Sequence, residues 1–215
     1  MHYTSVLFDL DGTLLDTLGD LTAAMNRTLT RHGLPERTRQ QMRAALGNGA
    51  RRLMELSVPT GTDSALFETL LAEYNADYAA HCRIETAPYP GVAALLRALH
   101  AQGCKLAILS NKPDEAVRAL RADFFAGAVP IAVGETAAIR RKPAPDMLLA
   151  AMEQLGADPA GTVFVGDSEV DIATARAAGL PCISVLWGFR DRDVLERAGA
   201  QQFAADAGEL ARLLD

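Results

Sequence analysis

The chain has 215 residues and a formal net charge of −6, from 21 Lys and Arg residues against 27 Asp and Glu residues. At roughly 100–200 residues per domain, this length holds one medium domain, or a core domain with a small additional one. Hydrophobic residues make up 49% and charged residues 22%, so a core can form and a disordered chain is disfavoured. The acidic balance excludes bulk attraction to nucleic acid or to an anionic membrane.

Export, membrane insertion and a thiolate metal site are not indicated. The first residues lack a basic, apolar leader, and no uncharged run approaches the ~18 residues of a membrane span, so we expect a cytoplasmic protein. The cysteines form no C-x-x-C pair and the histidines have no metal-ligand spacing. We interpret all of them as packing or solvated side chains: Cys82, Cys104, Cys182, His2, His32, His81 and His100.

The predicted elements begin with a short strand, Ser5–Phe8, followed by a helical insert. Between residues 17 and 82 no strand signal appears, whereas apolar residues recur at helical spacing: Leu18, Leu21, Met25 and Leu29, then Leu66, Leu70 and Tyr74. Asp16 is predicted to cap the first insert helix. The turn-rich segment Ala87–Gly91 suits a hinge or linker. We therefore expect a helical domain over 17–82 and a core domain over 1–16 and 83–215.

After the linker, helices and strands alternate. In chain order, the pattern predicts Val92–Ala101 as helix, Lys105–Leu109 as strand, Glu115–Arg121 as helix, Val129–Val133 as strand, Asp146–Leu155 as helix, Thr162–Val165 as strand, Ile172–Ala178 as helix and Cys182–Leu186 as strand. This alternation predicts an α/β fold, a Rossmann-like, doubly wound parallel sheet. The insert lies between the first two strands, from where it could cover the carboxyl ends of the strands, the edge at which such sheets bind ligands.

Polar side chains follow the first two predicted strands. Asp9 and Asp11 come directly after Ser5–Phe8 and enter a Gly-Thr turn, so both carboxylates would lie near one reaction centre. A surface turn is the alternative. Ser110–Lys112 follows the second strand, where a hydroxyl and free backbone N–H groups could bind phosphate oxygens. An ordinary helix N-cap is equally compatible with Ser and Asn.

Two further charged clusters complete the pattern. Lys142 lies in a proline-stiffened segment and could neutralise a phosphoryl group or nearby carboxylates; a solvated basic loop is the alternative. Asp167 and Asp171 follow the strand Thr162–Val165. Bringing them together with Asp9 and Asp11 would be costly, because neighbouring carboxylates repel one another. A bound divalent cation resolves that conflict, and an all-oxygen ligand set without His or Cys predicts Mg²⁺.

The ordered segments FDLDGTLLDT, LSNK, RKPAPD and GDSEVD resemble the four motifs of the haloacid dehalogenase-like hydrolase superfamily. The resemblance spans almost the whole chain, and the helical insert resembles that family's small α-helical cap. Because the dehalogenase branch lacks an acid at Asp11, the resemblance implies phosphoryl transfer. It implies Asp9 as the nucleophile that becomes an aspartyl phosphate, and Asp11 as the general acid and then base.

The same resemblance implies the remaining site residues. Mg²⁺ would be held by the Asp9 carboxylate, the Asp11 backbone carbonyl and Asp167, with Asp171 as a further ligand or a neighbour of the ligands. The transferring oxygens would be bound by Ser110, Lys142 and the backbone N–H groups of Gly12 and Asn111, with Thr13 steadying the catalytic loop. The segment Trp187–Phe189 is predicted to pack in the core, with a place near the site as the alternative.

The insert contains one candidate substrate-binding passage. Gly47, Asn48 and Gly49 could form a tight loop that exposes N–H groups, and Arg51 or Arg52 could pair with a substrate carboxylate. A plain helix–helix turn explains the glycines equally well. The passage is similar to the cap loop of bacterial phosphoglycolate phosphatases.

This resemblance implies a Mg²⁺-dependent phosphatase that acts on a small phosphate monoester. The first substrate to expect is 2-phosphoglycolate. Another sugar-phosphate or nucleotide phosphatase, a pyrophosphatase and a phosphoglucomutase-like enzyme remain open, because the core motifs do not distinguish them. A phosphate-sensing module without turnover is the alternative from a different class. The expected partner is a small-molecule phosphate ester, not nucleic acid or a membrane, and the protein is expected to be a monomer or homodimer.

Overall fold

The computed structural model describes residues 3–215, so His2 lies outside the described residues. The chain forms two compact units, one of residues 1–16 and 88–215 and the other of residues 17–87. The helical unit begins after Asp16, where the sequence placed its start. It ends after Ala87, whereas the sequence placed its end after residue 82. The reason is Asp20, whose carboxylate accepts hydrogen bonds from the backbone N–H groups of Ile84, Glu85 and Thr86 at 2.9–3.0 Å.

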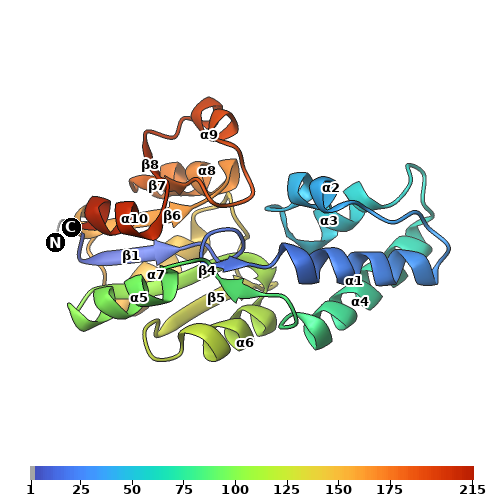
Figure 1. Cartoon of the computed structure of the whole chain (residues 1–215), viewed down its shortest axis with the longest axis horizontal. Coiled ribbons are helices and arrows are strands. Elements are labelled where there is room, and N and C mark those ends of the chain that lie inside the picture. The colour runs from blue at the N-terminus through green and yellow to red at the C-terminus, as the bar shows by residue number, and fades with distance from the viewer. Residues whose placement is uncertain (1–2) are drawn as a thin grey trace. The chain divides into compact units, whose positions relative to one another are not determined.

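The core unit is built on a six-stranded sheet with the order β5-β4-β1-β6-β7-β8, in which the paired strands run parallel (Figure 1). The strands are β1 (Ser5–Phe8), β4 (Lys105–Pro113), β5 (Ile131–Glu135), β6 (Thr162–Gly166), β7 (Cys182–Val185) and β8 (Gln202–Ala204). The helices are α5 (Val92–Ala101), α6 (Asp114–Phe125), α7 (Asp146–Leu155), α8 (Glu169–Ala178), α9 (Arg192–Ala198) and α10 (Ala207–Leu214), with a short 3-10 turn at Pro159–Gly161. The predicted α/β parallel sheet with flanking helices is confirmed.

The buried strand β1 lies between β4 and β6 at the centre of the sheet. In the register, Leu7 lies opposite Ala107 on one side and Phe164 on the other. These three side chains belong to a buried cluster that also contains Met147 of α7 and Ala175 of α8. Because successive side chains of a strand point to opposite faces, the alternate residues of the same strands face the other way. The runs of apolar residues seen in the sequence therefore supply both faces of the sheet.

Several element bounds differ from the sequence prediction. The helices Val92–Ala101 and Asp146–Leu155 and the strand Ser5–Phe8 have the predicted bounds. Strand β4 continues to Pro113 instead of ending at Leu109, with an irregular register between these residues. Helix α8 starts at Glu169, earlier than predicted, because Ser168 and Asp171 form a capping box at its N-terminus. The strand β8 and the helices α9 and α10 were not predicted.

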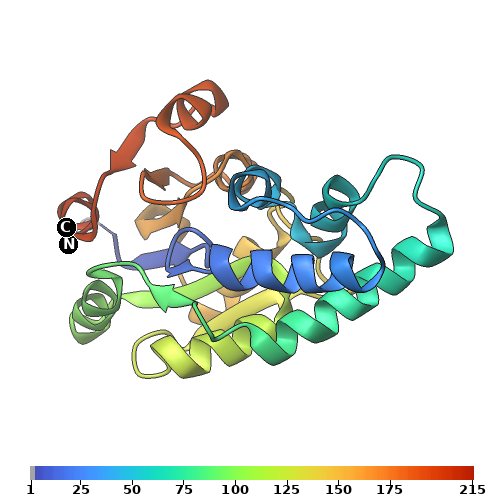
Figure 2. The ribbon, with the colours of Figure 1, turned by 45° about the vertical axis from the view of Figure 1, so that its right-hand side comes forward.

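The second unit is helical, as the sequence predicted. Its helices are α1 (Leu18–Arg31), α2 (Arg39–Ala45), α3 (Gly49–Ser57) and α4 (Ser64–His81). Helices α1 and α4 lie side by side (Figures 1 and 2) and bury Met25, Leu29, Leu70 and Tyr74. The N-cap of α1 is Thr17, so the prediction that Asp16 caps this helix is wrong. Asp16 instead ends the short strand β2 (Leu15–Asp16), which pairs with β3 (Ala87–Pro88).

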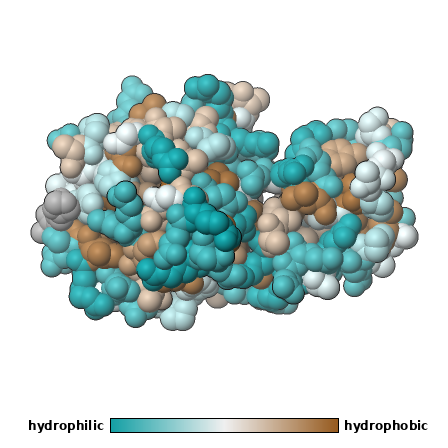
Figure 3. All heavy atoms as spheres, turned by 90° about the horizontal axis from the view of Figure 1, so that it is seen from above, coloured by the Kyte–Doolittle hydropathy of each residue, from teal (hydrophilic) through white to brown (hydrophobic). Residues whose placement is uncertain are grey.

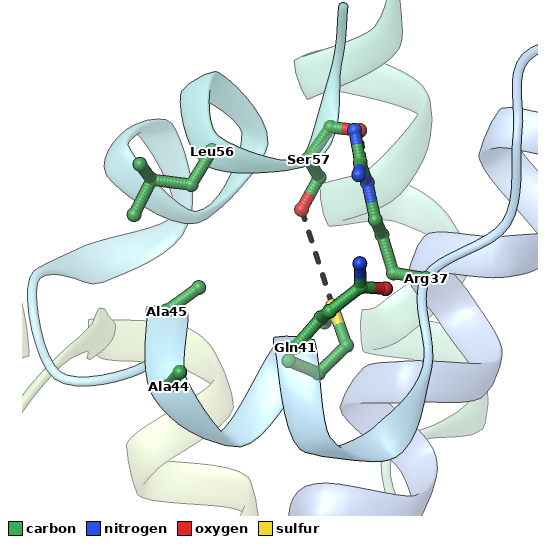
Figure 4. Close-up of a pocket in the computed structure, with 7 residues that line it drawn as sticks. Arg37, Gln41, Ala44, Ala45, Leu56 and Ser57 are labelled. Carbon is green, nitrogen blue, oxygen red and sulfur yellow. Dashed lines mark hydrogen bonds between the residues drawn. The ribbon is translucent and has the colours of Figure 1, made fainter.

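The helical unit carries hydrophobic surface and a pocket of its own. Figure 3 shows hydrophobic residues gathered on this unit, where Leu56 and Ile84 are 47% and 69% exposed. The pocket has a volume of about 330 Å³ and is lined by residues around α2 and α3 (Figure 4), namely Arg37, Gln41, Met42, Ala44, Ala45, Leu56 and Ser57. Within residues 3–215, no helix is both long enough and apolar enough to cross a membrane.

Candidate active site

The predicted acidic residues meet at the carboxyl edge of the central strands. Asp9 follows β1, and Asp167 follows the neighbouring strand β6. Asp171 lies in the first turn of α8. Carboxylate oxygens of all three residues lie within 4.8 Å of one another, and all three side chains are buried. Parallel neighbours explain the convergence, because the carboxyl ends of parallel strands lie at one edge of the sheet.

Lys142 lies between two of these carboxylates. Its Nζ donates to Asp9 Oδ1 and to Asp171 Oδ1, both at 2.6 Å, and its side chain is 3% exposed. Burial alone would lower the pKa of Lys142, but the charges of Asp171 and Asp9 and the hydrogen bonds to them raise it above its ordinary value. Lys142 is therefore a fixed cation, and the solvated-loop interpretation does not hold for it. Arg140 and Arg141 are exposed and pair with Asp146 and Glu135.

Asn111 holds the backbone that carries this lysine. Its side-chain amide donates to the Lys142 carbonyl at 2.9 Å, and its Oδ1 accepts from the Lys142 N–H at 2.8 Å. This reciprocal pair joins β4 to the segment before α7. The amide of Asn111 thus positions Lys142, and it is not an N-cap, because the following helix begins only at Asp114.

Asp167 is held by two elements of the core unit. Its Oδ2 accepts a hydrogen bond of 2.6 Å from the Phe189 N–H, and its Oδ1 lies 3.5 Å from the donor Thr13 Oγ1. Burial raises the pKa of Asp167 to about 7, and the neighbouring Asp171 carboxylate adds to the rise. For Asp9, burial likewise raises the pKa well above its ordinary value, against the opposing effect of Lys142. Both carboxylates are therefore costly to ionise where they lie.

Asp171 uses both of its oxygens within the protein. Oδ1 accepts from Lys142, whereas Oδ2 accepts from the Ser168 N–H at 3.1 Å and from Ser168 Oγ at 2.6 Å. Gly166 makes this approach possible, because a Cβ there would lie 2.4 Å from Asp171 Cβ. Of the two roles left open by the sequence, direct ligand or neighbour of the ligands, these contacts favour the second.

Asp11 lies beside a second pair of β4 residues. Its Oδ2 accepts from Ser110 Oγ at 3.3 Å, and its Oδ1 lies 3.1 Å from Lys112 Nζ. The irregular register of β4 lies at this point, and bulges of this kind redirect side chains next to active sites. No role was predicted for Lys112 from the sequence. The feature that could have indicated one is its place in the polar cluster Ser110–Lys112 at the end of a strand.

The catalytic loop is closed by contacts that the sequence did not indicate. Gly12 has φ 84° and donates its N–H to the Leu15 carbonyl at 2.9 Å, so this N–H serves the turn instead of pointing to a ligand as predicted. A Cβ at Gly12 would lie 2.3 Å from Asp167 Oδ2. The indole N–H of Trp187 donates to the Thr13 carbonyl at 3.0 Å. The Trp187–Phe189 segment therefore contacts the site. These contacts favour the alternative, a place near the site, over the predicted role in the core alone.

The candidate substrate-binding passage of the helical unit forms the loop into α3. Gly47 and Gly49 both have positive φ values, 111° and 78°, and Asn48 is the N-cap of α3. The Arg51 guanidinium makes two hydrogen bonds of 2.8 Å to the Glu68 carboxylate and lies 5.3 Å from the centre of the Phe67 ring. These four predicted residues are not among those that line the pocket of Figure 4. Arg52 pairs with Glu55.

The donor set fits a hard divalent cation. The three converging side chains are carboxylates, and their oxygens are the ligands that Mg²⁺ prefers. The raised pKa values of Asp9 and Asp167 show that these carboxylates lack sufficient positive charge nearby, even though Lys142 contacts Asp9. A cation bound between Asp9 and Asp167 would supply that charge. The hydrogen bond that Asp167 Oδ1 accepts from Thr13 Oγ1 is long, at 3.5 Å, so this oxygen could also bind a cation.

This chain is similar to known hydrolases and phosphatases. The family model for haloacid dehalogenase-like hydrolases matches residues 6–185. A phosphoglycolate phosphatase of Xanthomonas campestris pv. campestris is 35% identical over 86% of this chain and 84% of its own length. An N-acetylmuramic acid 6-phosphate phosphatase of Pseudomonas aeruginosa is 33% identical over 100% of this chain and 96% of its own.

Among solved structures, that of a protein from Lactobacillus delbrueckii subsp. bulgaricus matches with a TM-score of 0.94 and 35% identity, covering 100% of this chain and 99% of that one. The predicted class of enzyme, a phosphoric monoester hydrolase, is confirmed by the family model and these curated phosphatases. The chain belongs to the haloacid dehalogenase-like hydrolase family.

Proposed function

We propose that the chain is a Mg²⁺-dependent phosphatase that hydrolyses 2-phosphoglycolate through an aspartyl-phosphate intermediate. The observation that carries the proposal is the buried group of Asp9, Asp167, Asp171 and Lys142, with Asp11 beside it at the same sheet edge. The choice of substrate is supported by the phosphoglycolate phosphatase of Xanthomonas campestris and by a relative of that name from Pseudomonas putida, 37% identical over 86% of this chain.

The first displacement uses the two aspartates of the catalytic loop. A carboxylate oxygen of Asp9 forms a bond to phosphorus while the bond from phosphorus to the leaving oxygen breaks. Asp11 gives its proton to that leaving oxygen, so the oxygen departs as a hydroxyl group instead of an alkoxide. Lys142 keeps Asp9 oriented through its 2.6 Å hydrogen bond. Ser110, whose hydroxyl lies 3.3 Å from Asp11, is placed to donate to a phosphoryl oxygen instead.

The second displacement regenerates Asp9. Asp11, now ionised, takes a proton from water as the water oxygen bonds to phosphorus and the bond from phosphorus to Asp9 breaks. Inorganic phosphate is released, and Asp11 is again protonated for the next turnover. When bound, Mg²⁺ supplies positive charge against the carboxylates and the phosphoryl oxygens. Asp9 and Asp167 would hold it together with the Asp11 carbonyl, while Asp171 holds Lys142.

Turnover of an aryl phosphate, with Mg²⁺ and with excess chelator, tests the mechanism. Asp9→Asn and Asp11→Asn should each abolish most activity, and chelator should do the same to the wild type. Asp193→Asn is the matched control, because Asp193 lies on α9 with a 64% exposed side chain paired to Arg197. Full activity of Asp9→Asn, or activity that survives chelation, would contradict the proposal. A phosphate-sensing module would show no turnover at all.

Two further measurements address the intermediate and the substrate. After an acid quench, labelled phosphate should remain on the wild-type protein and be absent from Asp9→Asn. A panel of small phosphate esters, compared by kcat/KM, should rank 2-phosphoglycolate first. A sugar-phosphate phosphatase is the second candidate, favoured by the Pseudomonas aeruginosa relative that matches 100% of this chain. If bulky sugar phosphates rank as high, the second candidate replaces the first; pyrophosphate, nucleotides and a mutase assay belong in the same panel.

A further inference from the structure

A second buried lysine lies beside the proposed acid of the candidate active site. The side chain of Lys112 is 4% exposed, and its Nζ lies 3.1 Å from Asp11 Oδ1. Lys142 contacts different carboxylates, those of Asp9 and Asp171. One ammonium group therefore serves the nucleophile, and another lies at the residue that handles the leaving oxygen. The phosphoryl chemistry described above uses only Lys142.

The position of Lys112 is built into the sheet. Its N–H donates to Ser110 Oγ at 3.2 Å, within the irregular end of β4. On the neighbouring strand, a Cβ at Gly134 would lie 2.7 Å from the Lys112 carbonyl oxygen, and the Gly134 N–H donates to Asp114 Oδ1 at 2.9 Å. The close approach of β5 thus holds the backbone at the Lys112 carbonyl and beyond it, while Ser110 holds the Lys112 N–H. A side chain fixed in this way suits recognition better than a solvated surface lysine does.

The leaving group lies within reach of this ammonium. A leaving oxygen that receives a proton from Asp11 must approach its carboxyl group to about 2.6–3.2 Å. Lys112 Nζ lies 3.1 Å from the same carboxyl group. When both contact Oδ1, the leaving oxygen and Nζ are at most about 6 Å apart. In an ester of a 2-hydroxy acid the carboxylate carbon is two bonds from the leaving oxygen, so the carboxylate oxygens can lie between that oxygen and Nζ.

We propose that Lys112 is a specificity-determining residue that binds a carboxylate of the leaving group, which favours phosphate esters of 2-hydroxy acids. The inference rests on the proposed function and names the core residue that selects its substrate. Arg51, the carboxylate-binding candidate from the sequence, already has both carboxylate oxygens of Glu68 as partners within the helical unit. Lys112 takes the place of Arg51 in this role.

The test compares 2-phosphoglycolate with ethyl phosphate, which has the same length of leaving group and no carboxylate. For each protein, the specificity ratio is kcat/KM for 2-phosphoglycolate divided by kcat/KM for ethyl phosphate. Lys112→Met should lower this ratio by at least about tenfold, mainly through a higher KM for 2-phosphoglycolate, because a charge-assisted hydrogen bond is lost. Lys112→Arg, which retains the positive charge, should have a specificity ratio between those of Lys112→Met and the wild type. Lys105→Met on the same strand is the control, because Lys105 is exposed.

The outcomes separate this inference from the proposed function. If Lys112→Met lowers kcat/KM equally for both esters, Lys112 acts only through Asp11 and the inference is wrong. A ratio that collapses in Arg51→Met but not in Lys112→Met would also overturn it, because the carboxylate would then be bound by the helical unit. Should Lys112→Met fail to fold, Lys112→Gln is measured in the same way. A wild-type protein without preference for 2-phosphoglycolate would overturn the proposed substrate and, with it, this inference.

Discussion

Replacing Asp167 by Asn should stabilise the metal-free protein while it impairs catalysis. The Asp167 side chain is buried, and its pKa is raised from 3.8 to about 7, by burial first and then by the Asp171 carboxylate. A carboxyl group whose pKa is higher in the folded than in the unfolded state favours folding at low pH. This contribution is lost as the pH rises through the folded pKa. An Asn side chain can still accept the hydrogen bond from the Phe189 N–H without the charge.

The magnitude follows from the two pKa values. The rise from 3.8 to about 7 corresponds to roughly 4 kcal/mol at pH 8, since one pKa unit is worth about 1.36 kcal/mol. At pH 5 only the part between 3.8 and 5 is lost, roughly 2 kcal/mol. In chelator, the Asn variant should therefore exceed the wild type in unfolding free energy, and by more at pH 8 than at pH 5.

Urea unfolding in chelator at both pH values measures this difference, with Asp193→Asn as the exposed control. Adding Mg²⁺ should raise the unfolding free energy of the wild type and have much less effect on Asp167→Asn, because a ligand that binds only the folded state stabilises it. The reasoning is refuted if the Asn variant is no more stable than the wild type at pH 8 in chelator. It is also refuted if the difference in unfolding free energy between the two proteins is not smaller at pH 5 than at pH 8.

Three other substitutions test contacts that lie within one unit or the other. Gly188→Ala would place a methyl group 2.3 Å from Asp167 Cβ, so we expect about 1–3 kcal/mol of destabilisation and a large loss of kcat, measured by urea unfolding and aryl phosphate turnover. Asn111→Ala removes both hydrogen bonds to the Lys142 backbone and should cost about 2–3 kcal/mol and lower kcat; unchanged kcat would contradict the positioning role. Asp20→Ala removes the acceptor of the buried Thr86 N–H and hydroxyl and of two part-buried N–H groups, and should lower stability by about 3 kcal/mol in thermal unfolding, whereas equal stability would remove the reason for the domain boundary after residue 87.

The sequence by itself determined the parallel α/β core and indicated the residues that we propose carry the chemistry. The helices Val92–Ala101 and Asp146–Leu155 were predicted with their observed bounds, because an apolar face with helical period and a following polar or glycine residue are local signals. The convergence of Asp9 and Asp167 could also be expected, since both follow apolar strands and parallel strands end at one edge. Strand β4 was predicted too short because Ser-Asn-Lys-Pro has the composition of a turn, while pairing with β5 extends it.

The tertiary structure alone decided what each polar atom contacts. Segments far apart in the chain supply these partners: Asn111 holds Lys142, Phe189 donates to Asp167, and Lys112 lies beside Asp11. No local pattern reports such pairings, because they depend on the order and register of the strands. The same holds for charge, since burial raises the pKa of Asp167 and makes a bound cation favourable there. Length, composition and net charge argued against bulk attraction of nucleic acid or an anionic membrane, whereas only packing shows how cationic side chains are concentrated at one edge of an acidic protein.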